Sequence, residues 1–273
     1  MNQIRLANVT LDYPAQAGGG SVRALERVSL QVRDGEFVSL VGPSGCGKST
    51  ILRLISGLLS PTTGTVQLDG VPVHGVPPSV GFMFQHDALL PWSTAQGNVE
   101  LALELRGISR RDREPRARTL LETVGLAGFE AAYPATLSGG MRKRVDLARV
   151  LAYDPSVYLM DEPFGALDAQ TKVQLGAELL RIWDDLDRTV LFVTHDIEEA
   201  IGLSDRVLVM SRRPGHIKSE YRIDLPRPRD FYEVRFTARF QELHRAIWRD
   251  LADEALPVEP AAPEPADAVG ARG

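Results

Sequence analysis

The stretch that most constrains the fold is GPSGCGKST at residues 42–50, which directly follows the apolar run EFVSLVG. It fits the pattern G-x-x-x-x-G-K-[ST] through Gly42, Gly47, Lys48 and Ser49. Glycines in such a loop let backbone N–H groups curl around a phosphate without Cβ clashes. The apolar run is typical of a buried central strand, and the residues after the loop have helical spacing. The sequence therefore predicts a strand–loop–helix unit that binds phosphate, and a chance glycine-rich turn would not explain both flanks.

Each polar residue of this loop has an expected role. Lys48 would meet the β- and γ-phosphates of a nucleotide, the Ser49 hydroxyl would ligate Mg²⁺, and Thr50 would lie near the α-phosphate. Cys46 is either a reactive thiol or a small side chain that fits the loop, and the second interpretation is favoured. The expected phosphate-binding residues are Gly42, Pro43, Ser44, Gly45, Cys46, Gly47, Lys48, Ser49 and Thr50.

Composition narrows the class of protein. The chain has 273 residues, of which 44% are hydrophobic and 25% charged, and a net charge of −5. This is the balance of a globular protein, and its acidity argues against nucleic acid as a main partner. The single cysteine excludes an intrachain disulfide and indicates a reducing compartment. The start does not read as a secretory signal and no apolar stretch reaches about 20 residues, so work at a membrane would require a partner protein.

Strand and helix patterns divide the chain into regions. Strands are expected at residues 4–13, 27–32, 36–42, 64–70 and 80–85, with a flexible loop at 14–21. Residues 93–151 are rich in Ala, Leu and Arg and show helical spacing. Strands at 156–162, 188–196 and 205–211 then alternate with helices at 169–186 and 197–203, which implies a parallel sheet covered on both faces. The expected fold is α/β: a phosphate-loop NTPase core with a mixed sheet, an antiparallel β subdomain and an inserted helical subdomain.

The remaining residues suggest a simple domain plan. One main domain is expected over residues 1–230, with the helical subdomain at about 93–151 inside it. A C-terminal helix is expected at residues 231–254, where it either regulates the protein or covers a sheet edge. Residues 255–273 are rich in Pro, Ala and Glu and are expected to be disordered.

Polar residues follow three of the predicted strands. Asp161 and Glu162 end the run SVYLMDE, His195 follows VLFVT, and Gln85 closes VGFMFQ. The carboxyl ends of parallel strands share one edge of a sheet, where such folds bind ligands. We expect Asp161 and Gln85 to hold Mg²⁺, Glu162 to polarise an attacking water, and His195 to contact that water and the γ-phosphate. A surface acidic pair is the alternative for Asp161 and Glu162, but the apolar strand before them argues against it.

A second helix start resembles a phosphate site. The stretch LSGGMRKRVDLARV begins with Ser138, Gly139 and Gly140 and continues with helical spacing. Small residues that open a helix expose backbone N–H groups to an anion. One chain would then carry two such sites for one nucleotide.

Together these motifs resemble the ATP-binding-cassette ATPases. GPSGCGKST, Gln85, LSGG, LMDEP, ALD and TH occur in that family's order over roughly residues 1–225. GPSGCGKSTILRLISGL, LLPW, LSGGMRKR and DEPFGALDAQTK are similar to a narrower group, the cassettes of nitrate/sulfonate/taurine-type bacterial importers, and MSRRPGHI and LPRPR read similarly. Members of that group serve several small solutes, among them vitamin precursors, so the group does not fix the solute.

The resemblance implies an ATP- and Mg²⁺-dependent ATPase that works as a head-to-tail dimer of two copies of this chain. Each ATP would lie between the Lys48 loop of one copy and the Ser138-Gly139-Gly140 helix start of the other. Asp168, in ALD, would run along the interface. Tyr13 lies where the family places an aromatic side chain that stacks on adenine, and a strand-end core tyrosine is the alternative.

The chain departs from the family pattern in the signature helix. Met141 replaces a Gln, a change common in the importer group. Lys143 stands where many of that group have Gln, and Asp146 stands where a small apolar residue is usual. The effect of Lys143 and Asp146 is left open.

The resemblance also implies partners. An integral-membrane permease would dock on residues 86–93 with Trp92 as an anchor, although Trp92 could equally pack inside the helical subdomain. A solute-binding protein would act indirectly, and the chain would sit peripherally on the cytoplasmic face of the inner membrane. The alternatives are a soluble cassette ATPase that acts on DNA or ribosomes, an exporter cassette, and a regulatory ATPase. A single cassette without sustained heptads and with negative charge disfavours the first of these.

Overall fold

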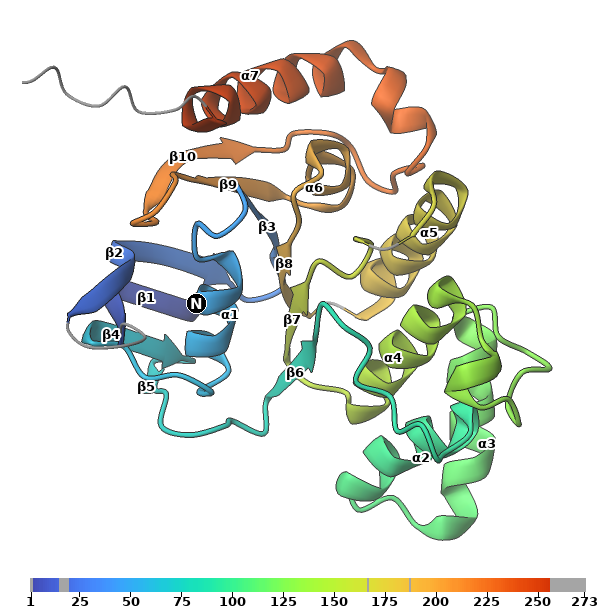
Figure 1. Cartoon of the computed structure of the whole chain (residues 1–273). Helices are drawn as coiled ribbons and strands as arrows, with labels where there is room; N and C mark the ends of the chain where they lie inside the picture. Colours follow the sequence, from blue (N-terminus) through green and yellow to red (C-terminus); the bar gives the residue numbers. More distant parts are fainter. Residues whose placement is uncertain (1, 15–19, 166, 187, 256–273) are drawn as a thin grey trace, which may run out of the picture.

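The computed structural model describes residues 2–14, 20–165, 167–186 and 188–255 (Figure 1). The loop expected at residues 14–21 lies largely outside the described residues, and so does the tail expected at 255–273, apart from Ala255. None of the helices in the described ranges is long and apolar enough to cross a membrane.

A six-stranded sheet forms the centre of the molecule. Its order is β10-β9-β3-β8-β7-β6, and all neighbours are parallel except β10, which runs antiparallel to β9. Every residue of β3, β7 and β8 is buried because both faces of the sheet are covered. The strands are β3 (Phe37–Val41), β6 (Val80–Met83), β7 (Val157–Asp161), β8 (Thr189–Val193), β9 (Arg206–Met210) and β10 (Ile217–Arg222).

A second, antiparallel sheet packs on one side of α1 (Lys48–Ile55). It has the order β2-β1-β4-β5 and comprises β1 (Asn2–Pro14), β2 (Ser21–Arg33), β4 (Thr63–Leu68) and β5 (Val71–Pro72). The apolar side chains of α1 share one core with residues of β1 and β3. The mixed sheet and the antiparallel sheet confirm the expected fold class. The sequence patterns missed β5, which has two exposed residues, and β10, whose sequence IKSEYR is mostly polar.

The helical region consists of α2 (Ala95–Leu105), α3 (Arg110–Thr123), a 3₁₀ turn (Pro134–Thr136) and α4 (Gly139–Tyr153). It lies beyond β6, on the far side from the antiparallel sheet (Figure 1). Its helices share a core that includes Val99, Leu103, Leu121 and Val145. Side-chain caps fix two helix starts: Thr94 accepts a hydrogen bond from the Gly97 N–H and Ser138 one from the Met141 N–H.

Helices α5 (Ala169–Leu186), α6 (Ile197–Leu203) and α7 (Ala238–Ala255) complete the structure. The sequence predicted a helix from residue 231, and its start is wrong. A 3₁₀ turn (Glu233–Phe236) comes first, and Thr237 is extended and caps α7 through its hydroxyl, which accepts from the Phe240 N–H. The apolar face of α7 buries Phe240, Leu243 and Ile247 against α6 and β9, so this helix covers the sheet.

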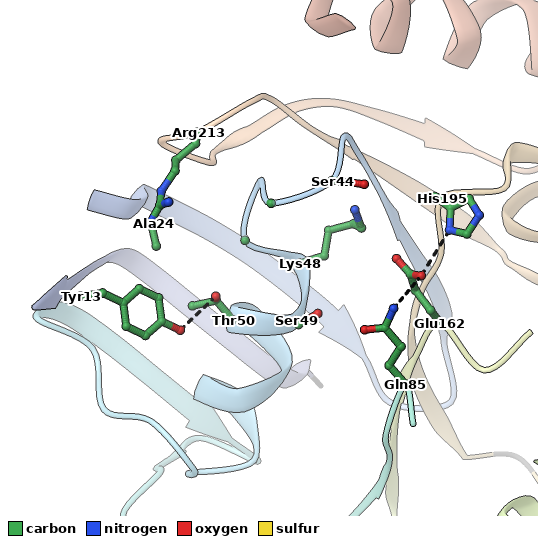
Figure 2. A pocket seen from close by; sticks show the side chains of 12 residues that line it. Tyr13, Ala24, Ser44, Lys48, Ser49, Thr50, Gln85, Glu162, His195 and Arg213 are labelled. Atoms are coloured by element: carbon green, nitrogen blue, oxygen red, sulfur yellow. Dashed lines mark hydrogen bonds and ion pairs between the residues drawn. The ribbon is translucent and has the colours of Figure 1, made fainter. Parts of the chain in front are cut away.

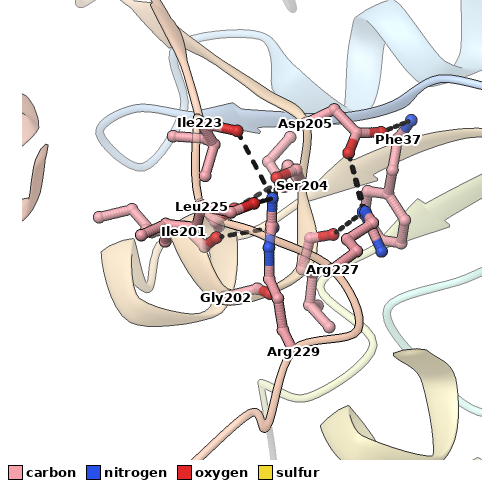
Figure 3. Close-up of polar contacts among 12 residues, drawn as sticks. Phe37, Ile201, Gly202, Ser204, Asp205, Ile223, Leu225, Arg227 and Arg229 are labelled. Atoms are coloured by element: carbon pink, nitrogen blue, oxygen red, sulfur yellow. Dashed lines mark hydrogen bonds and ion pairs between the residues drawn. The ribbon is translucent and has the colours of Figure 1, made fainter. Parts of the chain in front are cut away.

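Two arginines tie the segment before α7 to the sheet (Figure 3). Arg229 is 8% exposed and donates to backbone carbonyls, including that of Ser204 at 2.6 Å. Arg227 binds Asp205, whose other carboxylate oxygen accepts from the Phe37 N–H at the start of β3. These contacts hold the amino end of the central strand in register with the C-terminal layer.

Candidate active site

A cavity of about 460 Å³ opens between α1 and the carboxyl ends of β6, β7 and β8 (Figure 2). Most of the side chains that the sequence singled out meet there, although they come from five separate parts of the chain. The lining residues are Tyr13, Ala24, Ser44, Gly45, Gly47, Lys48, Ser49, Thr50, Gln85, Glu162, His195 and Arg213.

The phosphate loop is shaped by its glycines. Gly47 caps α1 with a φ of 107°, and a Cβ there would lie 2.5 Å from the Leu25 Cδ2, so both conformation and space require glycine. The Lys48 ammonium donates to the carbonyls of Gly42 at 2.8 Å and Pro43 at 3.0 Å, which holds it inside the curve of the loop. The loop therefore presents a cation and the amino end of a helix to the cavity, an arrangement that suits phosphate.

Two further residues near the cavity, Cys46 and Tyr13, take part in the hydrophobic core. Cys46 is 1% exposed, and burial raises the pKa of its thiol, so little thiolate forms near neutral pH. This favours the interpretation of Cys46 as a small packing side chain. Tyr13 packs partly on the same core. Its hydroxyl lies 3.2 Å from the Thr50 Oγ1, at the end of the cavity opposite Glu162 (Figure 2).

Ser49, which lines the cavity, is hydrogen-bonded to Asp161. The Ser49 hydroxyl donates to the Asp161 Oδ1 at 3.0 Å, and Asp161 is 5% exposed. Burial raises the pKa of Asp161, while the Ser49 hydrogen bond opposes that shift. Within the described residues no group of three or more His, Cys, Asp or Glu could hold a metal. Hydroxyl, carboxylate and the nearby Gln85 amide are the oxygen ligands that Mg²⁺ prefers, and phosphate oxygens of a ligand would complete such a set.

Glu162, which follows β7, contacts residues that follow the two neighbouring strands, β6 and β8. Its Oε2 accepts from the Gln85 Nε2 at 3.2 Å and lies 3.3 Å from the His195 Nδ1 (Figure 2). Because β6, β7 and β8 are neighbours in one parallel sheet, the residues after them converge as the sequence predicted. Glu162 also has a φ of 46°, which is uncommon for a residue with a side chain.

A buried network supports the segment that carries His195. The Thr194 hydroxyl donates to the Glu199 carboxylate at 2.6 Å, and Lys172 of α5 binds the other Glu199 oxygen at 2.8 Å. Asp196 caps α6 by accepting from the Glu198 and Glu199 N–H groups. The sequence patterns missed this network because its members are spread over two helices and a strand end.

Four of the expected site residues lie apart from the cavity. Ser138, Gly139, Gly140 and Asp168 are not among the described residues that line it. Gly42, Pro43, Cys46 and Asp161 do not line it either, but they adjoin it in the phosphate loop or through the Ser49 hydrogen bond. Ser138 is exposed at the start of α4. Asp168 is exposed and caps α5, with Thr171 donating its N–H at 3.0 Å and its hydroxyl at 2.6 Å. These hydrogen bonds lower the pKa of Asp168. Within one chain, the second helix start and the phosphate loop therefore form separate surfaces.

Arg213 is a lining residue that the sequence patterns did not single out. Its Nε donates to the Arg23 carbonyl at 3.1 Å. Two residues on, Gly215 touches the phosphate loop so closely that a Cβ would lie 1.9 Å from the Cys46 carbonyl oxygen. The Arg212 N–H donates to Glu254 of α7 at 2.8 Å. The motif MSRRPGHI therefore forms a turn that joins the C-terminal helix to the cavity.

The expected docking segment is exposed. Trp92 is 73% exposed, so the alternative of a side chain packed inside the helical region is wrong. A groove of about 260 Å³ lies on β6, α2 and α4, and its lining includes Phe82, Leu101, Leu105 and Tyr153.

Known proteins resemble this chain along most of its length. Residues 25–165 match the ABC transporter family. An uncharacterized ABC transporter ATP-binding protein of Methanocaldococcus jannaschii is 48% identical over 93% of each chain. The nitrate import ATP-binding protein of a Synechocystis species is 51% identical over 76% of this chain and 78% of its own. The taurine import ATP-binding protein of a Jannaschia species is 42% identical over 89% of this chain and 91% of its own. A solved dimeric ATP-binding cassette in a post-hydrolysis state, bound to ADP and Pi, superposes with a TM-score of 0.73 at 35% identity and covers 82% of this chain and 100% of that one.

Proposed function

The chain belongs to the ABC transporter family and is an ATP-binding subunit of it, and we propose that it hydrolyses ATP as a dimer and drives a separate permease that imports a small solute. The observation that carries this proposal is the convergence of the Lys48 loop, the Ser49–Asp161 pair and the Gln85–Glu162–His195 cluster on one cavity. Each part matches a step that ATP hydrolysis needs.

Hydrolysis would take place at the carboxyl end of β7. Lys48 and the loop N–H groups would hold the β- and γ-phosphates. Ser49, Asp161 and Gln85 would hold Mg²⁺, which would supply positive charge against the phosphates. A water beside Glu162 passes a proton to the carboxylate as its oxygen attacks the γ-phosphorus, and the bond to the bridging oxygen of ADP breaks. The Gln85 and His195 contacts at 3.2 and 3.3 Å fix the direction of that carboxylate.

The dimer proposal rests on the helix start that the cavity leaves out. Ser138, Gly139 and Gly140 open α4 at an exposed position, and the first turn of a helix attracts anions. Two copies related by a two-fold axis would place this start over the partner's nucleotide, with Asp168 beside the interface and Tyr13 against adenine. The similar cassette of known structure is a dimer, which supports this arrangement.

The transport proposal rests on the relatives and on the exposed segment. Relatives at 42–51% identity are named nitrate and taurine import ATP-binding proteins, which supports a small solute of the nitrate, sulfonate or taurine type. The exposed Trp92 and the apolar groove on β6, α2 and α4 fit an integral-membrane permease. The chain would then act peripherally at the cytoplasmic face of the membrane, and a solute-binding protein would select the solute.

The first experiment replaces Glu162 by Gln, which keeps the shape of the side chain and removes the proton acceptor. We expect turnover to fall about 10²–10³-fold while ATP drives a stable dimer, detected by light scattering. Glu198→Gln on α6 is the matched control and should behave as the wild type. Turnover near the wild-type rate in Glu162→Gln would disprove the proposed role of Glu162.

The second experiment separates the importer from a soluble cassette or an exporter. In cells that express the chain with its permease, Trp92→Ala should abolish uptake of labelled nitrate or taurine and leave the ATPase activity of the isolated chain intact. Export of the label would favour the exporter. Full activity in the soluble fraction, with no effect of Trp92→Ala on any flux, would favour a cassette without a transport role.

A further inference from the structure

Lys143 is a buried cation in the second turn of α4. It is 3% exposed, and its Nζ donates to the carbonyl oxygens of Phe84 at 3.0 Å and Gln85 at 2.8 Å and lies 3.5 Å from the Asp87 Oδ1. Two of the three ammonium N–H donors have carbonyl acceptors, and the charge is also paired with the Asp87 carboxylate. A buried charge is tolerated only with such pairing, so the geometry of this contact is tightly defined.

Neighbouring basic side chains of α4 bind the same segment. The Arg142 Nε donates to the Asp87 Oδ2 at 2.7 Å, and Arg149 donates to the Ala88 carbonyl. Residues 84–88, which follow β6, are therefore held from one side by three cations of one helix. A segment without regular structure obtains a fixed position in this way.

Asp146 completes the charge cluster. It is 0% exposed and accepts from the Arg149 guanidinium at 2.5 Å. The positive charges of Arg149 and Lys143 stabilise its carboxylate, whereas burial opposes ionisation. The two departures from the family pattern, Lys143 and Asp146, thus belong to one buried electrostatic unit.

Residues 84–88 contact Glu162 through the side chain of Gln85. The Gln85 backbone is bound by Lys143, and the Gln85 amide donates to the Glu162 Oε2 at 3.2 Å. The helix that carries Lys143 begins at Ser138. Two hydrogen bonds therefore connect the helix that starts at Ser138 with Glu162.

We propose that Lys143 is a positioning residue for ATP hydrolysis: it fixes the Gln85 backbone to α4 and so sets where the Gln85 amide meets Glu162. This inference rests on the proposed function, because it assigns Lys143 to the same reaction. Binding of the partner's nucleotide at the Ser138 end of α4 is then transmitted to the chain's own Glu162. The charged Lys143 ammonium binds two carbonyls more strongly than the neutral amide of Gln would, and Gln is the usual residue at this position. The Gln85 backbone therefore follows a movement of α4 more closely.

The test is a double-mutant cycle between Lys143→Met and Gln85→Ala, followed by single-turnover ATP hydrolysis. Lys143→Met should lower the hydrolysis rate about tenfold and leave the nucleotide Kd of the isolated chain within about twofold. In the Gln85→Ala background the same change should lower the rate by less than about twofold, because Lys143 acts through Gln85. Lys143→Gln, which keeps an amide donor, should fall between wild type and Lys143→Met.

The controls separate positioning from stability and from failure of the proposed function. Lys218 pairs with the Asp253 and Glu254 carboxylates of α7 and does not line the cavity, so Lys218→Met should hydrolyse ATP at the wild-type rate. Equal losses in both backgrounds would overturn the proposal, since a purely structural lysine gives additive effects. If Lys143→Met does not fold, the cycle with Lys143→Gln decides by the same criterion. A wild-type chain that fails to hydrolyse ATP would overturn the proposed function itself.

Discussion

The starts of α1 and α4 are built from similar residues and lie in contrasting surroundings. At α1, Gly47 has a φ of 107° and the loop before it curves around the Lys48 ammonium, inside a cavity lined by residues from several strands. At α4, the Ser138 hydroxyl caps the helix, and this start is exposed and apart from the cavity. The first has the geometry expected of a complete phosphate cradle, whereas the second offers helix N–H groups that no other side chains of the described residues enclose.

This contrast explains why one chain carries two phosphate-binding patterns. An exposed helix start holds an anion weakly, because solvent competes for its N–H groups. Contact with a second copy would exclude that solvent and surround the start of α4 with the partner's side chains. The proposed dimer therefore follows from the incomplete site, and the variants below test the contrast in order of expected effect.

The largest effect is expected at the complete cradle. Lys48→Ala removes the ammonium that the loop carbonyls hold at 2.8 and 3.0 Å. We expect nucleotide affinity to fall about 30-fold and turnover about 10³-fold, because a charged contact to the transferring phosphate is lost. Isothermal titration with a non-hydrolysable ATP analogue and a phosphate-release assay measure the two losses. Unchanged affinity would place the nucleotide elsewhere.

The second effect is expected at the incomplete site. Ser138→Arg puts a bulky cation at the exposed start of α4, and turnover should fall about 10²-fold without loss of nucleotide affinity in the monomer. The milder Ser138→Ala only removes the cap that binds the Met141 N–H, which costs about 1 kcal/mol of stability. A large loss of monomer affinity in Ser138→Arg would show that this helix start serves the nucleotide of its own chain.

A pH-dependent effect is expected inside α4. Burial raises the pKa of Asp146 to about 6 from the ordinary value of 3.8, against the pull of Arg149 and Lys143 and with a small push from Asp87. The folded protein therefore holds a proton that the unfolded chain has lost. Asp146 should lower the free energy of unfolding by up to about 3 kcal/mol as pH rises from about 4 to about 6, with little change above that range.

The measurement is urea unfolding of wild type and Asp146→Asn across that pH range. The difference in unfolding free energy between the two proteins should shift in favour of Asp146→Asn as the pH rises. Parallel stability curves would show that Asp146 titrates normally. No such dependence is expected for the α1 start, whose shape depends on glycine conformation.

The smallest effect is expected from Arg213, at the edge of the complete cradle. Arg213→Gln removes an exposed cation that lines the cavity, and nucleotide Kd should rise about fivefold, or ~1 kcal/mol. Arg212→Gln is the matched control, because its side chain lies near Glu254 of α7. Equal Kd values for Arg213→Gln and wild type would show that Arg213 only holds the Arg23 carbonyl.

The sequence predicted the elements whose patterns are regular and missed those defined by contacts. Apolar runs located β3, β7 and β8, and the rule that parallel strand ends share an edge brought Gln85, Glu162 and His195 together. The sequence did not predict strand β10, because this strand lies at the edge of the sheet and its residues are mostly polar. The start of α7 was placed too early because the Thr237 cap has no apolar signal.

Contacts between residues far apart in the chain account for the site features that the sequence did not predict. Nothing near Lys143 in the chain shows that its ammonium binds the carbonyls of Phe84 and Gln85, which lie far upstream. Likewise, the turn that carries Arg213 meets the phosphate loop only because Gly215 lets two backbones approach closely. Such pairings depend on the folded path of the chain and have no local pattern.

The neighbours of β3 set the order in which this protein can assemble during synthesis. Phe37 pairs with Val190 and Val38 with Arg206, so the strand that carries the phosphate loop obtains both partners only after most of the chain exists. In the helical region, in contrast, α2, α3 and α4 contact one another and are close in sequence, so these contacts need less of the chain. A chain truncated before residue 189 would therefore contain every residue of the loop and lack both sheet neighbours of β3.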